Sequence, residues 1–174
     1  MKKINISKII ALFLIVFTYS QCINITSAVG QTKNTPLSDY DKLENYLHTL
    51  SNTLSVKNYD AIIFISDKEG SCFSCLKSFS DFVSQNLLNY NRILIILNAK
   101  GERINTSPYL SDTVKNVVTD YSNDFFRLKM ATTATSVIVI KENKIEGVCP
   151  VNPETLSEQM VLLARMRYSE NKTK

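Results

Sequence analysis

The sequence has no tryptophan, one histidine, four glycines and four prolines. With so few glycines and prolines, no internal repeat and no low-complexity stretch, its composition is that of an ordinary globular protein. Its 174 residues suit one domain plus a targeting segment. The one histidine, His48, has no second histidine and no positioned acid with which to build a catalytic triad. No haem, flavin or nucleotide-binding motif is present either, so we expect no cofactor.

Excess positive charge is also missing from most of the chain. The formal net charge is +4, but every Asp and Glu lies after residue 30, and removing Lys2, Lys3 and Lys8 lowers the charge by three, to +1. No basic stripe remains that would favour nucleic acid, and no polybasic patch that would favour an anionic membrane surface. We therefore expect no nucleic-acid partner.

The first 30 residues have the pattern of an export signal. Met1–Lys8 is basic, and Ile9–Phe17 is an unbroken apolar run. That run is shorter than the roughly 20 residues of a membrane-spanning helix. The pattern predicts export to the periplasm or cell envelope of a bacterium, with residues 31–37 as a linker. A membrane-anchored form stays open if Tyr19–Ile25 extends the apolar run.

Two kinds of processing compete for this leader. In one, the small residues at 28–30 serve ordinary signal cleavage. In the other, Cys22 is the lipidated cysteine of a bacterial lipoprotein, although the residues before it match a lipobox poorly. Either way three thiols remain in the exported part, Cys72, Cys75 and Cys149. An odd number of thiols does not make a disulfide-stapled scaffold.

Cys72-Phe73-Ser74-Cys75 is the most informative motif that is present. It follows the apolar run Ala61–Ile65 and opens a segment with helical spacing. The first thiol then lies at the positive end of a helix dipole, where the thiolate is favoured over the thiol. The second thiol falls one turn later, close enough to close a small disulfide ring. The motif therefore predicts dithiol redox chemistry.

Hydrophobic spacing predicts elements in the order α-β-α-β-α-β-β-α. Strands one and two are joined by a helix and should be parallel, whereas the short turn at 141–143 makes the last two strands an antiparallel hairpin. We expect an α/β fold with a mixed central sheet of about four strands and helices on both faces, a domain over 38–168 and a polar tail over 169–174. The predicted helices are Ser38–Leu54, Cys72–Asn89, Ser111–Val118, Asn123–Met130 and Pro153–Tyr168, and the predicted strands are Ala61–Ser66, Arg92–Leu97, Thr135–Ile140 and Lys144–Val148.

Three stretches carry a family resemblance: IIFISDKEGSCFSC, VVTDYSNDFFRLKM and TATSVIVIKENKIEGV. The first resembles a strand followed by an active dithiol. The second is similar to the segment before a substrate-contacting loop. The third looks like a Thr-Pro-Thr strand with its returning hairpin. Together they resemble the thioredoxin fold, and most closely the exported TlpA-like or redoxin-type thiol–disulfide oxidoreductases.

The resemblance implies an activity and the residues for it. Cys72 would be the attacking thiolate and Cys75 the resolving thiol, with Thr133, Ala134 and Thr135 as the substrate loop. The implied partners are protein thiols and disulfides, with a membrane thiol carrier as electron donor. The family's cis-proline position falls on Ala134. A cis bond before a non-proline residue costs about 2.5–4 kcal/mol, so we expect a trans or reshaped loop there.

Two other functions stay open for the same residues. In one, Cys72, Cys75 and Cys149 bind zinc or copper, which fits the loss of the cis-proline at Ala134. Zinc normally takes four ligands, and His48 is the only histidine that the chain offers. In the other, the domain is a redox-inert binding module of the cell envelope. Cys149 itself is either a third thiol beside the pair or a small buried hydrophobe at a strand end.

Overall fold

The structure, a computed structural model, describes residues 37–67, 72–99, 101–129 and 135–170. The chain divides into two units after residue 35, and all described residues belong to the second. The leader expected at 1–30, most of the linker and the end of the tail lie outside the described residues. No helix in the described ranges is both long and apolar enough to cross a membrane. The elements are α2 (Asp39–Leu50), η1 (Val56–Asn58), β1 (Ala61–Ser66), α3 (Phe73–Asn86), β2 (Ile93–Asn98), β3 (Val117–Thr119), η2 (Asp124–Leu128), β4 (Ser136–Lys141), β5 (Lys144–Pro150) and α4 (Leu156–Glu170).

The strands form one mixed sheet in the order β3-β2-β1-β4-β5. β1 and β2 are parallel, as expected for strands joined by the helical crossover α3. β4 runs antiparallel to β1, with Ser136 opposite Phe64, and β5 returns antiparallel to β4. This arrangement confirms the predicted fold class, an α/β thioredoxin-like fold with a mixed sheet, although the sheet has five strands.

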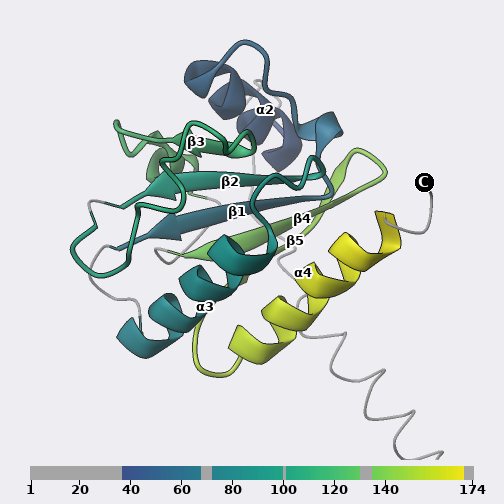
Figure 1. The fold of residues 1–174 in the computed structure, drawn as a ribbon. Helices are drawn as coiled ribbons and strands as arrows, with labels where there is room; N and C mark the ends of the chain where they lie inside the picture. Colours follow the sequence, from purple (N-terminus) through teal and green to yellow (C-terminus); the bar gives the residue numbers. More distant parts are fainter. Residues whose placement is uncertain (1–36, 68–71, 100, 130–134, 171–174) are drawn as a thin grey trace, which may run out of the picture. The chain divides into compact units, whose positions relative to one another are not determined.

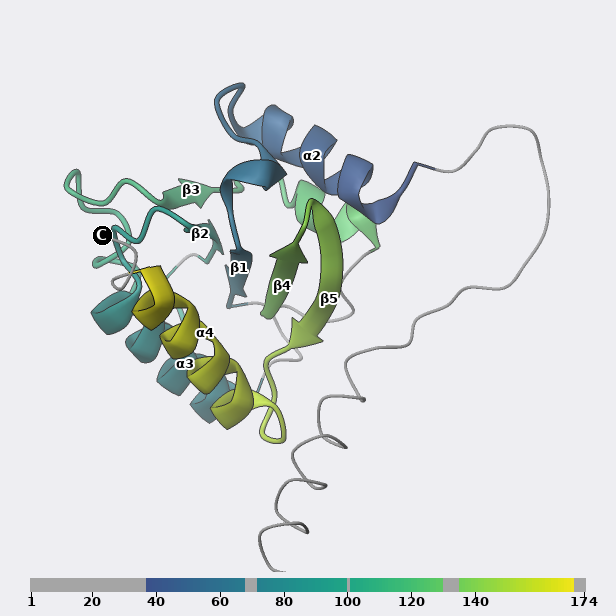
Figure 2. The same cartoon turned by 90° about the vertical axis from the view of Figure 1, so that its right-hand side faces the viewer.

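Helices cover both faces of the sheet (Figures 1 and 2). α3 and α4 pack on one face, in the layer that contains Ile63 and Val137. α2 and η2 pack on the other face, in the layer that contains Ile62 and Phe64. Because both faces are covered and β1 is central, all six residues of β1 are buried.

The strand that was not predicted is β3. It lies where a helix was predicted, at Ser111–Val118, and that prediction was wrong. That segment forms turns, and Val117–Thr119 pairs in parallel with β2, placing Val117 opposite Ile95. The preceding Asn116 is 5% exposed, and its side-chain amide donates to the carbonyls of three residues around the start of β2, Leu87, Tyr90 and Ile93. These bonds to distant backbone favour an extended segment over the local bonds of a helix.

The starts of α2 and α4 are set by side chains close to them in the sequence. Ser38, where the predicted first helix begins, caps α2: its hydroxyl accepts from the Asp41 backbone N–H at 3.1 Å and donates to the Asp41 carboxylate at 2.6 Å. The last helix begins at Leu156 rather than at Pro153. There the Asn152 side chain accepts from the backbone N–H groups of Glu154 and Thr155. These bonds hold residues 152–155 in a turn before the helix.

Candidate functional site

Cys72 and Cys75 lie at the start of α3, the helix that follows β1. Cys72 is the N-cap residue of α3, and Cys75 lies in its first turn. Their sulfur atoms form a disulfide, with the Cα atoms 5.2 Å apart. The prediction that the strand Ala61–Ser66 leads to a dithiol at a helix start is therefore confirmed.

The two cysteines differ in accessibility. Cys72 is half-buried, and the neighbouring Phe73 has 53% of its surface exposed. Cys75 is turned toward the interior and is only 5% exposed. A large partner can therefore approach the sulfur of Cys72 more readily than that of Cys75.

Two hydrogen bonds reach the Cys72 sulfur from its own helix turn. The backbone N–H of Cys75 donates to it at 3.4 Å, and the Ser74 hydroxyl lies 3.4 Å away. The N–H groups and dipole of the first turn add positive potential at this end of α3. When the disulfide is reduced, this environment favours a negative charge on the Cys72 sulfur.

Polar residues lie at the carboxyl ends of β1, β2 and β3. This is the end of the sheet from which the chain leads into α3. Asp67 follows β1, is 9% exposed, and accepts from the Glu102 backbone N–H at 3.2 Å. Asn98 ends β2 and donates from its side chain to the Asp120 carbonyl. The first bond ties the segment that follows β2 to the end of β1, the strand that leads into the dithiol, and the second ties the segment that follows β3 to the end of β2.

Thr135 is the described member of the predicted substrate loop; Thr133 and Ala134 lie outside the described residues. Its side chain is 2% exposed, and its hydroxyl accepts from the Ser66 N–H and donates to the Ser66 carbonyl, both at 3.2 Å. Its own carbonyl accepts from the Val151 N–H at 2.9 Å. Thr135 therefore joins the end of β1 to the start of β4 and to the segment after β5.

Cys149 lies on β5, outside the disulfide, and is 4% exposed. It pairs with Val137 across the β4–β5 hairpin. Directly opposed residues of antiparallel strands share a face, so Cys149 lies on the face that α3 and α4 cover. Its burial matches the predicted small hydrophobe at a strand end, and its part as a third thiol stays a prediction.

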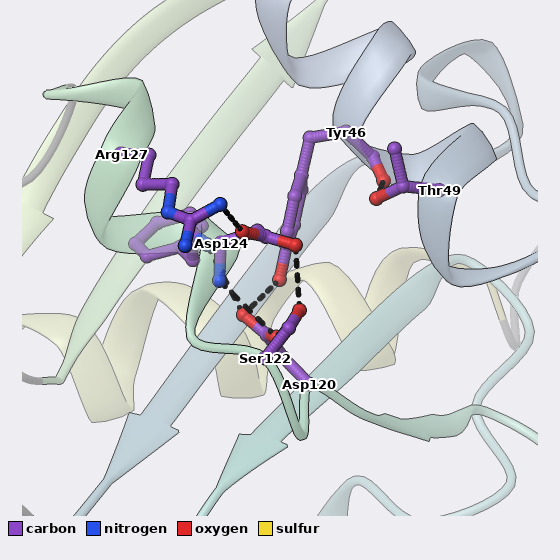
Figure 3. A network of polar contacts seen from close by, with 7 residues as sticks. Tyr46, Thr49, Asp120, Ser122, Asp124 and Arg127 are labelled. Atoms are coloured by element: carbon purple, nitrogen blue, oxygen red, sulfur yellow. Dashed lines mark hydrogen bonds and ion pairs between the residues drawn. The ribbon is translucent and has the colours of Figure 1, made fainter.

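A second polar cluster lies on the opposite face, under α2 (Figure 3). Asp120, which follows β3, is 1% exposed. Its carboxylate accepts from the Tyr46 hydroxyl at 2.9 Å, the Ser122 hydroxyl at 3.1 Å, and the backbone N–H groups of Phe125 at 3.1 Å and Asp124 at 3.3 Å. Tyr46 belongs to α2, so the cluster ties that helix to the segment between β3 and η2.

The pKa values of Asp120 and Tyr46 are shifted in opposite directions. Burial alone would raise the pKa of Asp120, but the bonds from Phe125, Tyr46, Ser122 and Asp124 outweigh it and lower the pKa. Burial, reinforced by the Asp120 carboxylate, raises the pKa of Tyr46. The cluster is therefore a charged carboxylate held by neutral donors, an arrangement that fixes structure rather than one poised to transfer protons near neutral pH.

His48 and Phe125 lie in structural positions. His48 is exposed on α2 with its Nε2 atom 3.4 Å from Glu44, as expected of a surface residue. Phe125 of η2 is 1% exposed and stacks on Phe64 with ring centroids 3.9 Å apart, so it belongs to the core. Among the described residues, no three His, Cys, Asp or Glu side chains gather as a metal-binding group.

Comparison of this protein with known protein families, with curated proteins and with solved structures finds no match. Its function is therefore inferred from the chain's own residues and their geometry. The sequence analysis found the dithiol but not the contact of Ser74 with the Cys72 sulfur, nor the burial of Asn116 and Asp120. Ser74 lies inside the motif, and its hydroxyl could have marked it. The partners of Asn116 are 23 to 29 residues away. Asp120 has local donors in Ser122, Asp124 and Phe125, but its bond to Tyr46 joins residues 74 positions apart.

Proposed function

We propose that this protein is a thiol–disulfide oxidoreductase that exchanges the Cys72–Cys75 dithiol or disulfide with protein partners. The observation that carries the proposal is a disulfide at the N-terminus of the helix that follows the central strand, with Cys72 half-buried and Cys75 buried. Dithiol exchange needs one accessible thiolate and one shielded thiol within reach of it.

In the reducing direction, the Cys72 thiolate attacks one sulfur of a partner disulfide. A Cys72–partner disulfide forms, and the other partner sulfur leaves as a thiolate. Cys75 then loses its proton and attacks the Cys72 sulfur, which closes the Cys72–Cys75 disulfide and releases the second partner thiolate. The partner gains two electrons and the protein loses two. A dithiol donor restores the reduced pair by the same exchange run in reverse.

We further propose that the chain is an exported protein of the TlpA-like or redoxin type, acting in a bacterial periplasm or cell envelope. Support comes from the basic and apolar pattern of residues 1–30 and from the three stretches that resemble those proteins. The electron donor is then a membrane thiol carrier. In an exported protein, both cysteines would meet an oxidising environment in which a redox pair can cycle.

The first test is a redox titration of the purified protein in defined glutathione buffers, with thiols trapped by alkylation and counted by mass. We expect one reversible two-electron transition, assigned to Cys72 and Cys75 by peptide mapping. Cys75→Ser should instead hold Cys72 as a mixed disulfide with glutathione, and Cys72→Ser should not. A pair that stays reduced throughout, with zinc or copper retained at one per chain, would refute the redox proposal in favour of metal binding.

A turnover assay completes the test. The reduced protein should reduce a small model disulfide with catalytic turnover when a dithiol such as dithiothreitol regenerates it. Both cysteine-to-serine variants should lose this turnover. A protein that shows neither a reversible Cys72–Cys75 disulfide with turnover nor retained zinc or copper would point to the redox-inert binding module.

A further inference from the structure

Ser74 stands between the two cysteines, and its hydroxyl is 3.4 Å from the Cys72 sulfur. A disulfide sulfur carries no hydrogen, so in this contact the Ser74 hydroxyl is the donor and the sulfur is the acceptor. The Cys75 backbone N–H donates to the same sulfur, also at 3.4 Å. The accessible sulfur of the pair therefore has a side-chain donor in addition to the backbone donor that the helix start provides.

We propose that Ser74 is a catalytic residue of the exchange reaction, a hydroxyl donor that stabilises the Cys72 thiolate. The inference rests on the proposed function for its biological purpose. A thiolate accepts hydrogen bonds more strongly than a disulfide sulfur, because bonds to a charged acceptor are the stronger ones. The Ser74 bond therefore strengthens when the pair is reduced, and it favours the reduced, anionic form.

Among the described residues, Ser74 is the only one whose side chain donates a hydrogen bond to the Cys72 sulfur. Besides the disulfide, the polar contacts of the Cys72 sulfur within the described residues are those from Ser74 and Cys75. The nearest described charges along the chain make other contacts: Asp67 accepts from the Glu102 N–H, and Lys77 pairs with Asp81 at 2.6 Å. The described donors to the Cys72 sulfur are therefore a hydroxyl and a backbone N–H, both uncharged.

Two measurable consequences follow. The thiolate is the form that reacts with alkylating agents, so Ser74 should accelerate alkylation of Cys72 and move the midpoint of its pH profile downward. Stabilising the reduced form should also make the disulfide more oxidising, since the equilibrium with glutathione shifts toward the dithiol. A merely structural serine would move neither quantity.

The test compares wild type, Ser74→Ala, Ser74→Thr and Ser78→Ala as full-length reduced proteins. Ser78 is a matched control, an exposed serine one turn further along the same helix. Alanine favours helix more than serine does, so Ser74→Ala should fold. The rate of Cys72 alkylation by iodoacetamide is measured from pH 4 to pH 9, with the modified residue identified by mass. Glutathione titrations of the same proteins give the disulfide equilibrium.

We expect Ser74→Ala to alkylate roughly three- to tenfold more slowly at pH values below the midpoint, the order of effect of one ordinary intramolecular hydrogen bond. Its midpoint should move upward and its glutathione equilibrium toward the disulfide. Ser74→Thr should restore the wild-type profile, and Ser78→Ala should match it. Superimposable profiles for wild type and Ser74→Ala would overturn the role of Ser74. The alkylation comparison decides this whether or not the pair cycles, whereas the wild-type titration decides the proposed function.

Discussion

Replacing Asp120 by asparagine is the sharpest test of how this fold is held together. The carboxylate is 1% exposed and accepts from four donors: Tyr46, Ser122, and the backbone N–H groups of Asp124 and Phe125. An asparagine side chain has one acceptor oxygen and one NH₂ donor. Its NH₂ group must therefore face some of the donors that the second carboxylate oxygen now satisfies.

The size of the effect follows from those contacts. One buried N–H or hydroxyl left without an acceptor costs about 1–3 kcal/mol, and the remaining bonds lose the assistance of the charge. We therefore expect Asp120→Asn to lower the free energy of unfolding at pH 7 by about 3 kcal/mol. Tyr46→Phe removes one donor and leaves the carboxylate with three, so it should cost about 1 kcal/mol. Both expected losses can be measured by urea unfolding followed by circular dichroism.

The pH dependence gives an independent check. The pKa of Asp120 is lowered in the folded state, so its charge adds stability that is fully present above the unfolded value of 3.8. That stability is lost as the pH falls through the folded pKa, below 3.8. The difference between wild type and Asp120→Asn should therefore shrink as the pH drops through this range. A variant within about 0.5 kcal/mol of wild type at pH 7, or a difference that stays constant on acidification, would refute this account.

Three further outcomes are expected. Phe125→Ala should cost about 3–5 kcal/mol because it empties the space under Phe64, whereas Phe73→Ala, at an exposed position, should stay within about 0.5 kcal/mol; equal losses in thermal unfolding would contradict this. Asn116→Ala should cost about 2–4 kcal/mol in urea unfolding, since three backbone carbonyls lose their donor; an unchanged midpoint would show that water replaces the amide. Incubating the protein with oxidised glutathione should leave Cys75→Ser with a glutathione on Cys72, located by peptide mapping, whereas the wild type should carry none on Cys72 at equilibrium; a wild type that accumulates the Cys72 adduct would exclude Cys75 as the resolving thiol.

The parts of the fold that were predictable are those with local causes. Ala61–Ser66 was recognisable because a central strand covered on both faces is continuously apolar. The start of α2 was recognisable because Ser38 and Asp41 form a cap within four residues. The β4–β5 hairpin was recognisable because a short polar turn separates two apolar runs.

The missed elements have causes that lie elsewhere in the chain. Val117–Thr119 has only three residues and no burial pattern of its own, and it is a strand because β2 offers an open parallel edge. Asn116 and Asp120 flank that strand and are buried, although both residue types are common at surfaces. The partners of Asn116 and the Tyr46 partner of Asp120 are distant along the chain, so no short window of sequence contains these contacts, although Ser122, Asp124 and Phe125 donate to Asp120 locally.

By itself, the sequence determined the α/β class, the parallel β1–β2 unit and the Cys72-x-x-Cys75 motif at a helix start, because apolar periodicity and motif spacing act over a few residues. Only the tertiary structure decided that Cys75 is buried while Cys72 is half-buried, and that Cys149 lies on the face covered by α3 and α4. It also decided that Asp120 stays a charged residue inside the protein. Burial and hydrogen-bond donors are supplied by segments far apart in the chain, so these properties exist only once the chain has folded.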